Sequence, residues 1–325
     1  MTPAGPRRCA VSIDLAALAC YYRIHALGEP PPELAHVILE RALPRAAALF
    51  ARRGLRVTWF VVGRDADATL ADPACAANAE RLRAQHALGD ELGNHSYSHP
   101  YELARLPADV VFDEIAGCHR VLRAIVGPAR AAVAGFRAPG YDVSPAMMTA
   151  LARLGYRYDS SIFSSPGYYA AKAAVMAALA LVGRPSGAVM TNPRALAAPT
   201  DPYRPAMTAP WRRGQAPLVE LPIAVTPWSR LPVIGTSLLV APAPLRDRLV
   251  AWMGRRTLFN FELHGIDFAD AERDGIPGEL VARQPDLRVP IDDKLARLDA
   301  LLDGIAAHWD FATLGEVATD VQRVR

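Results

Sequence analysis

The chain has 325 residues, enough for one large α/β domain or two smaller ones, and its 36 Lys and Arg against 33 Asp and Glu give a formal charge of +3. Hydrophobic residues make up 51% and charged residues 21%, a composition that permits a large buried core, so the chain need not be disordered. The small net charge, with no basic cluster interleaved with aromatic residues, gives no reason to expect a nucleic-acid partner.

Strand-like and helix-like segments alternate along the chain. In chain order we expect strand 10–14, helix 33–54, strand 57–62, helix 76–88, strand 91–95, helix 108–126, strand 133–137, helix 144–154, strands 218–225 and 257–264, and helix 292–308. Such alternation predicts an α/β fold, with a largely parallel sheet or barrel inside and helices outside. We expect a single domain over residues 1–325.

The stretch from about 166 to 244 departs from this alternation. Twelve prolines fall between Pro185 and Pro244, so much of this segment should be irregular. It is also apolar, which indicates an elaboration around the site instead of a linker. Two interpretations stay open: extra core or a dimer interface, or a surface for a lipid-linked or glycolipid substrate at a membrane.

Cysteine usage and hydropathy bear on the compartment. The four cysteines, Cys9, Cys20, Cys75 and Cys118, form no CxxC pair and are expected to be reduced thiols. The start of the sequence has no apolar signal segment, and the longest uncharged apolar run, 173–182, is too short to span a bilayer. We therefore expect a cytoplasmic protein, and we keep peripheral contact with the inner membrane open.

Four polar residues stand at the carboxyl ends of predicted strands: Asp14, His95, Arg137 and His264. In α/β barrels the catalytic groups gather at this end of the strands. His95 and His99, in the segment HSYSHP, are four residues apart and can meet one cation if the segment turns helically. The alternative is a pair of surface histidines near a turn.

The polar residues at the ends of the other predicted strands suggest acid–base chemistry. Arg137, in the segment RAPG, can hold a carboxylate such as Asp14 in its ionised form, and Gly140 closes a turn whose N–H can face an oxyanion. Asp14 is a candidate general base and His264 a candidate general acid, while Asp159 could fix the tautomer of a histidine. Taken singly, each residue could instead be an ordinary capping, turn or packing residue.

Taken together, these segments resemble the polysaccharide deacetylases, the NodB homology group of carbohydrate esterase family 4. The resemblance rests on Asp14, HSYSHP (95–100), RAPG (137–140), YDSS (158–161) and ELH (262–264), with TWFVVG (58–63) and GDELGNH (89–95) leading into the second motif. It implies a distorted (β/α) barrel of about seven strands and a metal-dependent hydrolase that removes an N-acyl group, in the first instance N-acetyl, from an amino sugar.

The resemblance also implies roles for individual residues. His95 and His99 would bind a divalent metal, with zinc as the expected ion, and Asp14 would act as the base, oriented by Arg137. The N–H of Gly140 would bind the oxyanion. His264 would protonate the leaving amine and would itself be oriented by Asp159.

The segment around Asp14 corresponds to the first motif of the family, which has two acids: a base and, one or two positions later, a metal ligand. This chain departs from that pattern, because neither Leu15 nor Ala16 supplies the second acid. Three explanations follow. Asp14 binds the metal itself, since two histidines, one carboxylate and a water molecule make a permissible zinc site. Another side chain supplies the ligand, with His25, Asp142 and Asp267 as candidates. Otherwise the metal site is weakened or lost.

Two other functions therefore remain open. A degenerate barrel could bind a glycan or glycolipid without hydrolysing it, which the altered first motif would explain. The same fold could also support an amide hydrolase or deformylase on a substrate that is not a polysaccharide, because a fold does not fix the substrate.

Overall fold

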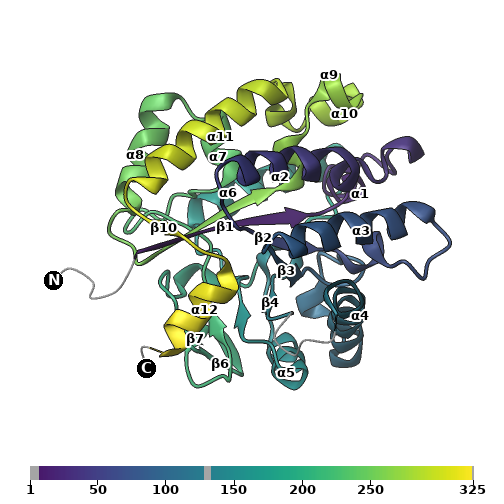
Figure 1. Cartoon of the computed structure of the whole chain (residues 1–325). Coiled ribbons are helices and arrows are strands. Elements are labelled where there is room, and N and C mark those ends of the chain that lie inside the picture. The colour runs from purple at the N-terminus through teal and green to yellow at the C-terminus, as the bar shows by residue number, and fades with distance from the viewer. Residues whose placement is uncertain (1–6, 128–132, 324–325) are drawn as a thin grey trace.

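The centre of the computed structural model, which describes residues 7–127 and 133–323, is a curled parallel sheet. Its strands follow the order β9 (Leu258–His264), β1 (Arg8–Leu15), β2 (Thr58–Val61), β3 (Glu91–Asn94), β4 (Gly135–Phe136), β5 (Tyr158–Asp159) and β8 (Val219–Glu220). β10 (Asp310–Phe311) pairs with the first residues of β1. Figure 1 shows β1 crossing the middle of the molecule.

The two ends of this strand order approach each other. The N–H of Ala224, just after β8, donates to the carbonyl of Asn260 in β9 at 3.1 Å. The side-chain amide of Asn260 returns a bond to the carbonyl of Leu221 at 3.0 Å. These bonds curl the seven strands into a distorted half-barrel, so the predicted fold class is confirmed.

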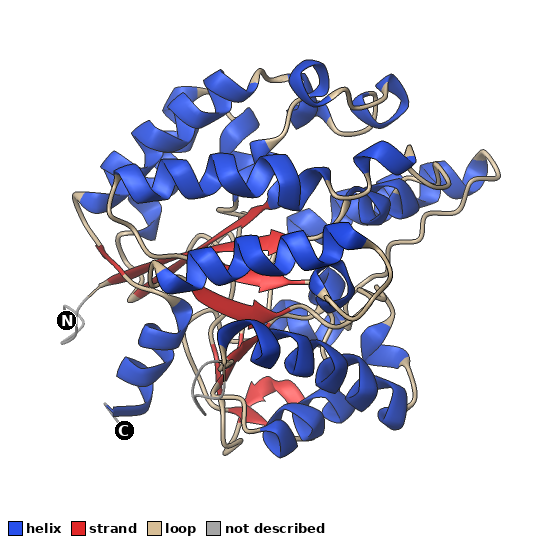
Figure 2. Ribbon diagram, turned by 45° about the vertical axis from the view of Figure 1, so that its right-hand side comes forward, coloured by secondary structure: helices blue, strands red, loops and turns tan. Residues whose placement is uncertain are grey.

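Helices surround the sheet, as Figure 2 shows. They are α1 (Leu18–Ile24), α2 (Leu43–Arg52), α3 (Pro73–Ala87), α4 (Ala108–Val126), α5 (Pro145–Leu154), α6 (Pro166–Leu181), α7 (Gly235–Val240), α8 (Ala243–Met253), α9 (Ala271–Asp274), α10 (Gly278–Val281), α11 (Ile291–Ala306) and α12 (Leu314–Arg323). A small antiparallel hairpin, β6 (Pro205–Ala206) and β7 (Ala209–Arg213), lies outside the main sheet.

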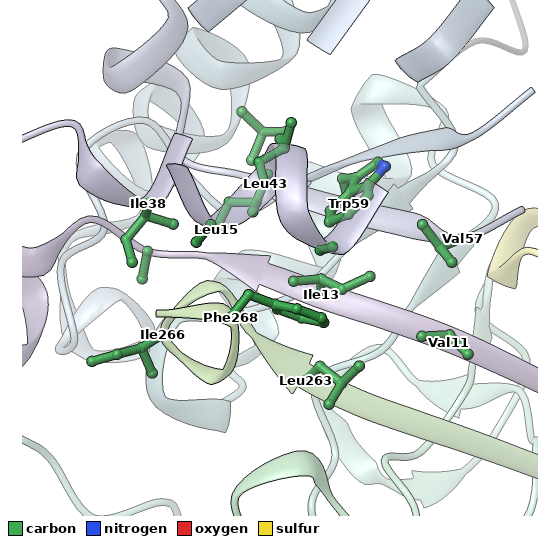
Figure 3. Packing of buried hydrophobic residues seen from close by; sticks show 14 of the residues in the cluster. Val11, Ile13, Leu15, Ile38, Leu43, Val57, Trp59, Leu263, Ile266 and Phe268 are labelled. Carbon is green, nitrogen blue, oxygen red and sulfur yellow. The ribbon is translucent and has the colours of Figure 1, made fainter. Parts of the chain in front are cut away.

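Side-chain alternation along β1 separates the core from the site. Val11, Ile13 and Leu15 belong to the main apolar cluster, which also contains Trp59 and Leu263 (Figure 3). Their neighbours Ser12 and Asp14 are also buried but take part in a polar network on the opposite face of the strand. Because successive side chains point to opposite faces, one strand supplies both the hydrophobic core and the interior polar groups.

Several predicted elements are shorter or more broken in the structure. The predicted helix 33–54 is a 3₁₀ turn at Pro32–Leu34, a π-helical turn at Ile38–Ala42 and then α2. Pro44 explains the break, because it has no N–H to donate to residue 40 of a regular α-helix. The predicted strand 133–137 is reduced to β4, two residues long. The segment 166–244 contains α6, the hairpin and α7 between irregular connections, and it also supplies β8 to the main sheet.

Candidate active site

Arg137 and Asp14 form the buried floor of the site. Arg137, completely buried, donates from Nη1 to Oδ1 of Asp14 at 2.7 Å. Its Nη2 donates to the hydroxyls of Ser12 and Ser160, both at 2.9 Å, and Nε donates to the carbonyl of Ser160. Burial alone would raise the pKa of Asp14, but Arg137 and the nearby imidazoles lower it overall. Asp14 is therefore held as a carboxylate.

The two histidines of the HSYSHP segment face each other beside this carboxylate. The Nε2 atoms of His95 and His99 are 3.2 Å apart, and Oδ2 of Asp14 lies 3.8 Å from Nε2 of His95. Both imidazoles are buried. The strand tip of β3 supplies His95, and the loop after it brings His99 back toward the same point.

This approach does not use the helical turn that the four-residue spacing favoured. Ser96 and His99 instead adopt positive φ angles of 64° and 57°, and the loop folds back on itself. Glu114 of α4 fixes the loop: its carboxylate accepts bonds from the N–H groups of Tyr97 and Ser98, at 3.0 and 2.9 Å, and from the Ser98 hydroxyl. The loop is therefore held by a side chain that the sequence did not single out.

The protonation of the two imidazoles suits metal binding. Nδ1 of His95 lies 2.8 Å from the carbonyl of Arg137, so it carries the proton and leaves the lone pair of Nε2 free. Burial lowers the pKa of His95 and lowers that of His99 further, so both rings are neutral near pH 7. Two tetrahedral zinc ligands with bonds of about 2.0–2.1 Å stand about 3.3 Å apart, close to the observed separation of the two Nε2 atoms.

The structure separates the candidates for the missing ligand. Asp14 is the acid beside the imidazoles. Asp142 is directed elsewhere, because its carboxylate accepts bonds from Thr191 and from the N–H of Asn192. Asp267 accepts the backbone N–H of His264 at 2.8 Å. His25 lines the same cavity as His95, His99 and His264, and among the described residues its buried Nε2 has no hydrogen-bond partner.

His264 meets an acid that sequence reasoning missed. Its Nε2 lies 3.2 Å from Oε1 of Glu262, and the hydroxyl of Tyr141 lies 2.6 Å from the same oxygen and 3.0 Å from the ring. Burial would lower the pKa of His264, but the carboxylates of Glu262, Asp14 and Asp267 raise it overall. A ligand atom from each of Asp14, Glu262 and His264 lies within 4.8 Å of the others.

The predicted pairing of Asp159 with His264 is not formed. The carboxyl group of Asp159 accepts a bond from Ser161 and interacts with Glu220, and burial raises its pKa to about 6. Among the described residues, the hydrogen-bond partners of the His264 ring are Glu262 and Tyr141. Side chains alternate between the two faces of a strand, so residues 262 and 264 of β9 point to the same side of the sheet. This alternation could have identified Glu262 from the sequence.

These groups line a cavity of about 330 Å³. Asp14, His95, His99, Gly140 and His264 all contribute to its wall. Gly140 has a φ of 66°, and a Cβ atom there would lie 3.1 Å from the ring of Tyr101. The close approach explains the glycine and leaves its backbone beside the cavity.

Comparison with known proteins adds a family to this geometry. Residues 36–158 match the family model of the polysaccharide deacetylases, a range that includes His95, His99, Arg137 and Gly140 but not Asp14 or His264. No curated protein matches the chain. The sequence-based prediction of the family is confirmed.

Similar solved structures support the fold. One from Mycobacterium smegmatis, assigned as a polysaccharide deacetylase, is 16% identical with a TM-score of 0.60, covering 99% of this chain and 93% of that one. Another with the same assignment, from Pseudomonas aeruginosa, is 14% identical with a TM-score of 0.58, covering 97% and 91%. The 4-α-glucanotransferase of Thermococcus litoralis is 12% identical with a TM-score of 0.53, covering 96% of this chain and 38% of that one. The fold therefore accommodates more than one chemistry.

Proposed function

Since residues 36–158 match the model of the polysaccharide deacetylase family, we propose that the chain is a metal-dependent hydrolase that removes an N-acyl group from an amino sugar. The observation that carries this proposal is the pair of neutral imidazoles, His95 and His99, beside the ionised carboxylate of Asp14, with His264 on the same cavity wall. These groups combine metal ligands with an acid and a base in one cavity.

His95, His99 and Asp14 would hold the ion, with zinc as the proposed metal. The bound ion supplies a Lewis acid that polarises the amide carbonyl and lowers the pKa of a water molecule. In this assignment Asp14 takes the place of the acid that Leu15 and Ala16 do not supply. Arg137 keeps the carboxylate charged and fixes its orientation through the bond at 2.7 Å.

The proton transfers belong to groups of the chain. Arg137 binds Oδ1 of Asp14, so Oδ2, the oxygen that faces His95, is proposed both to hold the ion and to accept the proton of the attacking water with its second lone pair. His264, kept protonated by Glu262, delivers a proton to the leaving nitrogen, because an amine leaves far more readily than its anion. The N–H of Gly140 is proposed to donate to the developing oxyanion beside the cavity.

The substrate is proposed to be an acylated amino sugar carried on a lipid. The outer wall of the cavity supports this choice, because α6 and its surroundings supply the apolar side chains Ala171, Val175, Met176, Ile24 and Ile234. A sugar alone would leave much of this surface without an apolar partner. We also propose a cytoplasmic protein in peripheral contact with the inner membrane.

Acyl release from acetylated amino sugars tests the function. We expect acetate release that stops after chelation and returns with zinc, and a loss of about 10²-fold or more in kcat for His264→Ala. His308→Ala, at an exposed position, is the matched control. Formate release alone would favour the deformylase alternative. Glycan binding without acyl release, across several divalent ions, would contradict hydrolysis and favour the degenerate barrel.

A further inference from the structure

Exposed apolar side chains are concentrated in one part of the chain. Among the described residues, eleven large hydrophobic side chains are exposed, and eight of them lie between residues 160 and 260. These eight are Val175, Leu181, Val182, Trp228, Leu231, Val240, Leu245 and Trp252. Single exposed apolar residues are ordinary, but their concentration in one segment is a reason to look there for a surface that contacts a partner.

The same segment carries an excess of positive charge. Residues 160–260 contain eleven Lys and Arg against three Asp and Glu, a net charge of +8, whereas the whole chain has +3. The rest of the chain therefore has a net charge of −5. Of these cations, Arg184, two residues after Val182, is exposed, and so is Arg255, whose guanidinium lies over the ring of Trp228. Exposed cations beside exposed apolar side chains match an anionic lipid surface better than a neutral protein partner.

Helix α6 joins this chemistry to the cavity. Of its sixteen residues only Tyr169 is buried, whereas Leu181 is 88% exposed and Val182, directly after the helix, is 69% exposed. Lys172, Val175 and Met176 of the same helix line the cavity wall. An apolar tail that leaves the cavity would therefore pass along exposed apolar side chains.

A second element lies beside the start of α6. The hydroxyl of Ser165 donates to the carbonyl of Arg230 at 2.8 Å, which places the loop 228–231 next to the helix. Trp228 in this loop is 76% exposed, and the guanidinium of Arg255 lies 4.6 Å from the centre of its ring. Tryptophan beside arginine is typical of side chains that lie at the headgroup level of a bilayer.

We propose that Val175, Leu181 and Val182 together with Trp228 and Leu231, here called the docking rim, bind the surface of an anionic membrane. The sugar of a lipid-linked substrate then enters the cavity while its lipid stays in the bilayer. Among the helices of residues 7–127 and 133–323, none has the length and apolarity to cross a bilayer. The choice of substrate rests on the proposed function, whereas membrane binding does not.

Sedimentation of the full chain with lipid vesicles tests the docking rim. We expect binding to vesicles that contain phosphatidylglycerol, little binding to phosphatidylcholine alone, and weaker binding at high salt. The double variant Leu181→Asp, Val182→Asp should bind at least about tenfold less tightly, and so should Trp228→Ser. Leu88→Asp, at an exposed apolar position outside the segment, is the matched control and should bind like the parent chain.

Two results would overturn the docking rim. One is a parent chain that does not sediment with anionic vesicles, or rim variants that bind as well as the parent. The other is a parent dimer that the double variant converts to monomers without a change in vesicle binding, because a second copy would then cover the rim. Acyl release from a water-soluble amino sugar, measured on the same variants, should be unchanged. If no chain, the parent included, releases an acyl group while vesicle binding is retained, the result would count against the proposed hydrolase and not against the docking rim.

Discussion

Two carboxylates on neighbouring strands set the chemistry of the individual residues. Asp14 on β1 lies in register with His264 on β9, and Ser12 lies in register with Glu262. In the proposed function Arg137 holds Asp14 as the base, whereas Glu262 holds His264 as the acid. Environments that drive the pKa values of neighbouring groups in opposite directions separate the acid from the base at one pH.

Replacing Glu262 tests this assignment at the residue scale. Without the carboxylate, the pKa of His264 should fall, so the protonated acid is lost at lower pH. We expect Glu262→Gln to lower kcat by about tenfold or more and to move the alkaline limb of the kcat–pH profile to lower pH. Glu272→Gln, at an exposed position, is the control. An alkaline limb that stays in place would remove Glu262 from this role.

At the scale of elements, the loop between β3 and α4 shapes the proposed metal site. It brings His99 to His95 with two positive φ angles, a conformation that non-glycine residues adopt only where the surroundings compensate for the strain. The three hydrogen bonds to Glu114 and the bond from the N–H of Ser96 to Asn94 provide that compensation. The precision of the imidazole pair therefore depends on α4.

Loosening this loop should weaken metal binding without unfolding the chain. We expect Glu114→Ala to reduce zinc affinity by about 10–100-fold, the usual cost of removing a group that orients a metal ligand. Competition with a chromophoric chelator measures the affinity. Asp113→Ala is the matched control, because Asp113 is the preceding residue of the same helix and is exposed. Equal affinities for the two variants would show that Glu114 does not position the site.

The sequence predicted the long helices and strands better than the short strands. The structure has α4 over the predicted residues 108–126, and it has β9 within one residue of its expected start, because long periodic segments form the same element in most contexts. β4 and β8 are only two residues long, since their extent depends on pairing with neighbouring strands. Asp159 was linked to the wrong partner for a similar reason: local sequence does not specify which strand tips meet.

For the whole molecule, the buried imidazoles couple stability to pH. Burial holds the pKa of His99 well below its ordinary value, so without metal the unfolded chain binds a proton that the folded chain does not. His99 should therefore lower the free energy of unfolding as the pH drops below about 6.5, by about 1.4 kcal/mol for each unit of its pKa difference.

Denaturant unfolding of the metal-free chain at several pH values measures this dependence. We expect His99→Gln to lose less stability than the parent between about pH 7 and pH 5, because the substituted side chain does not titrate. His308→Gln, at an exposed position, should follow the parent. Parallel profiles for parent and His99→Gln would mean that the imidazole is not held neutral in the folded chain.

The metal content of the purified chain tests the central claim most directly. Elemental analysis after reconstitution with zinc should find about one equivalent bound to the parent and to the His308→Ala control. His95→Ala should lose the metal, and Asp14→Asn should bind it more weakly. Zinc retained at full stoichiometry and affinity in both site variants would contradict a centre built from His95, His99 and Asp14.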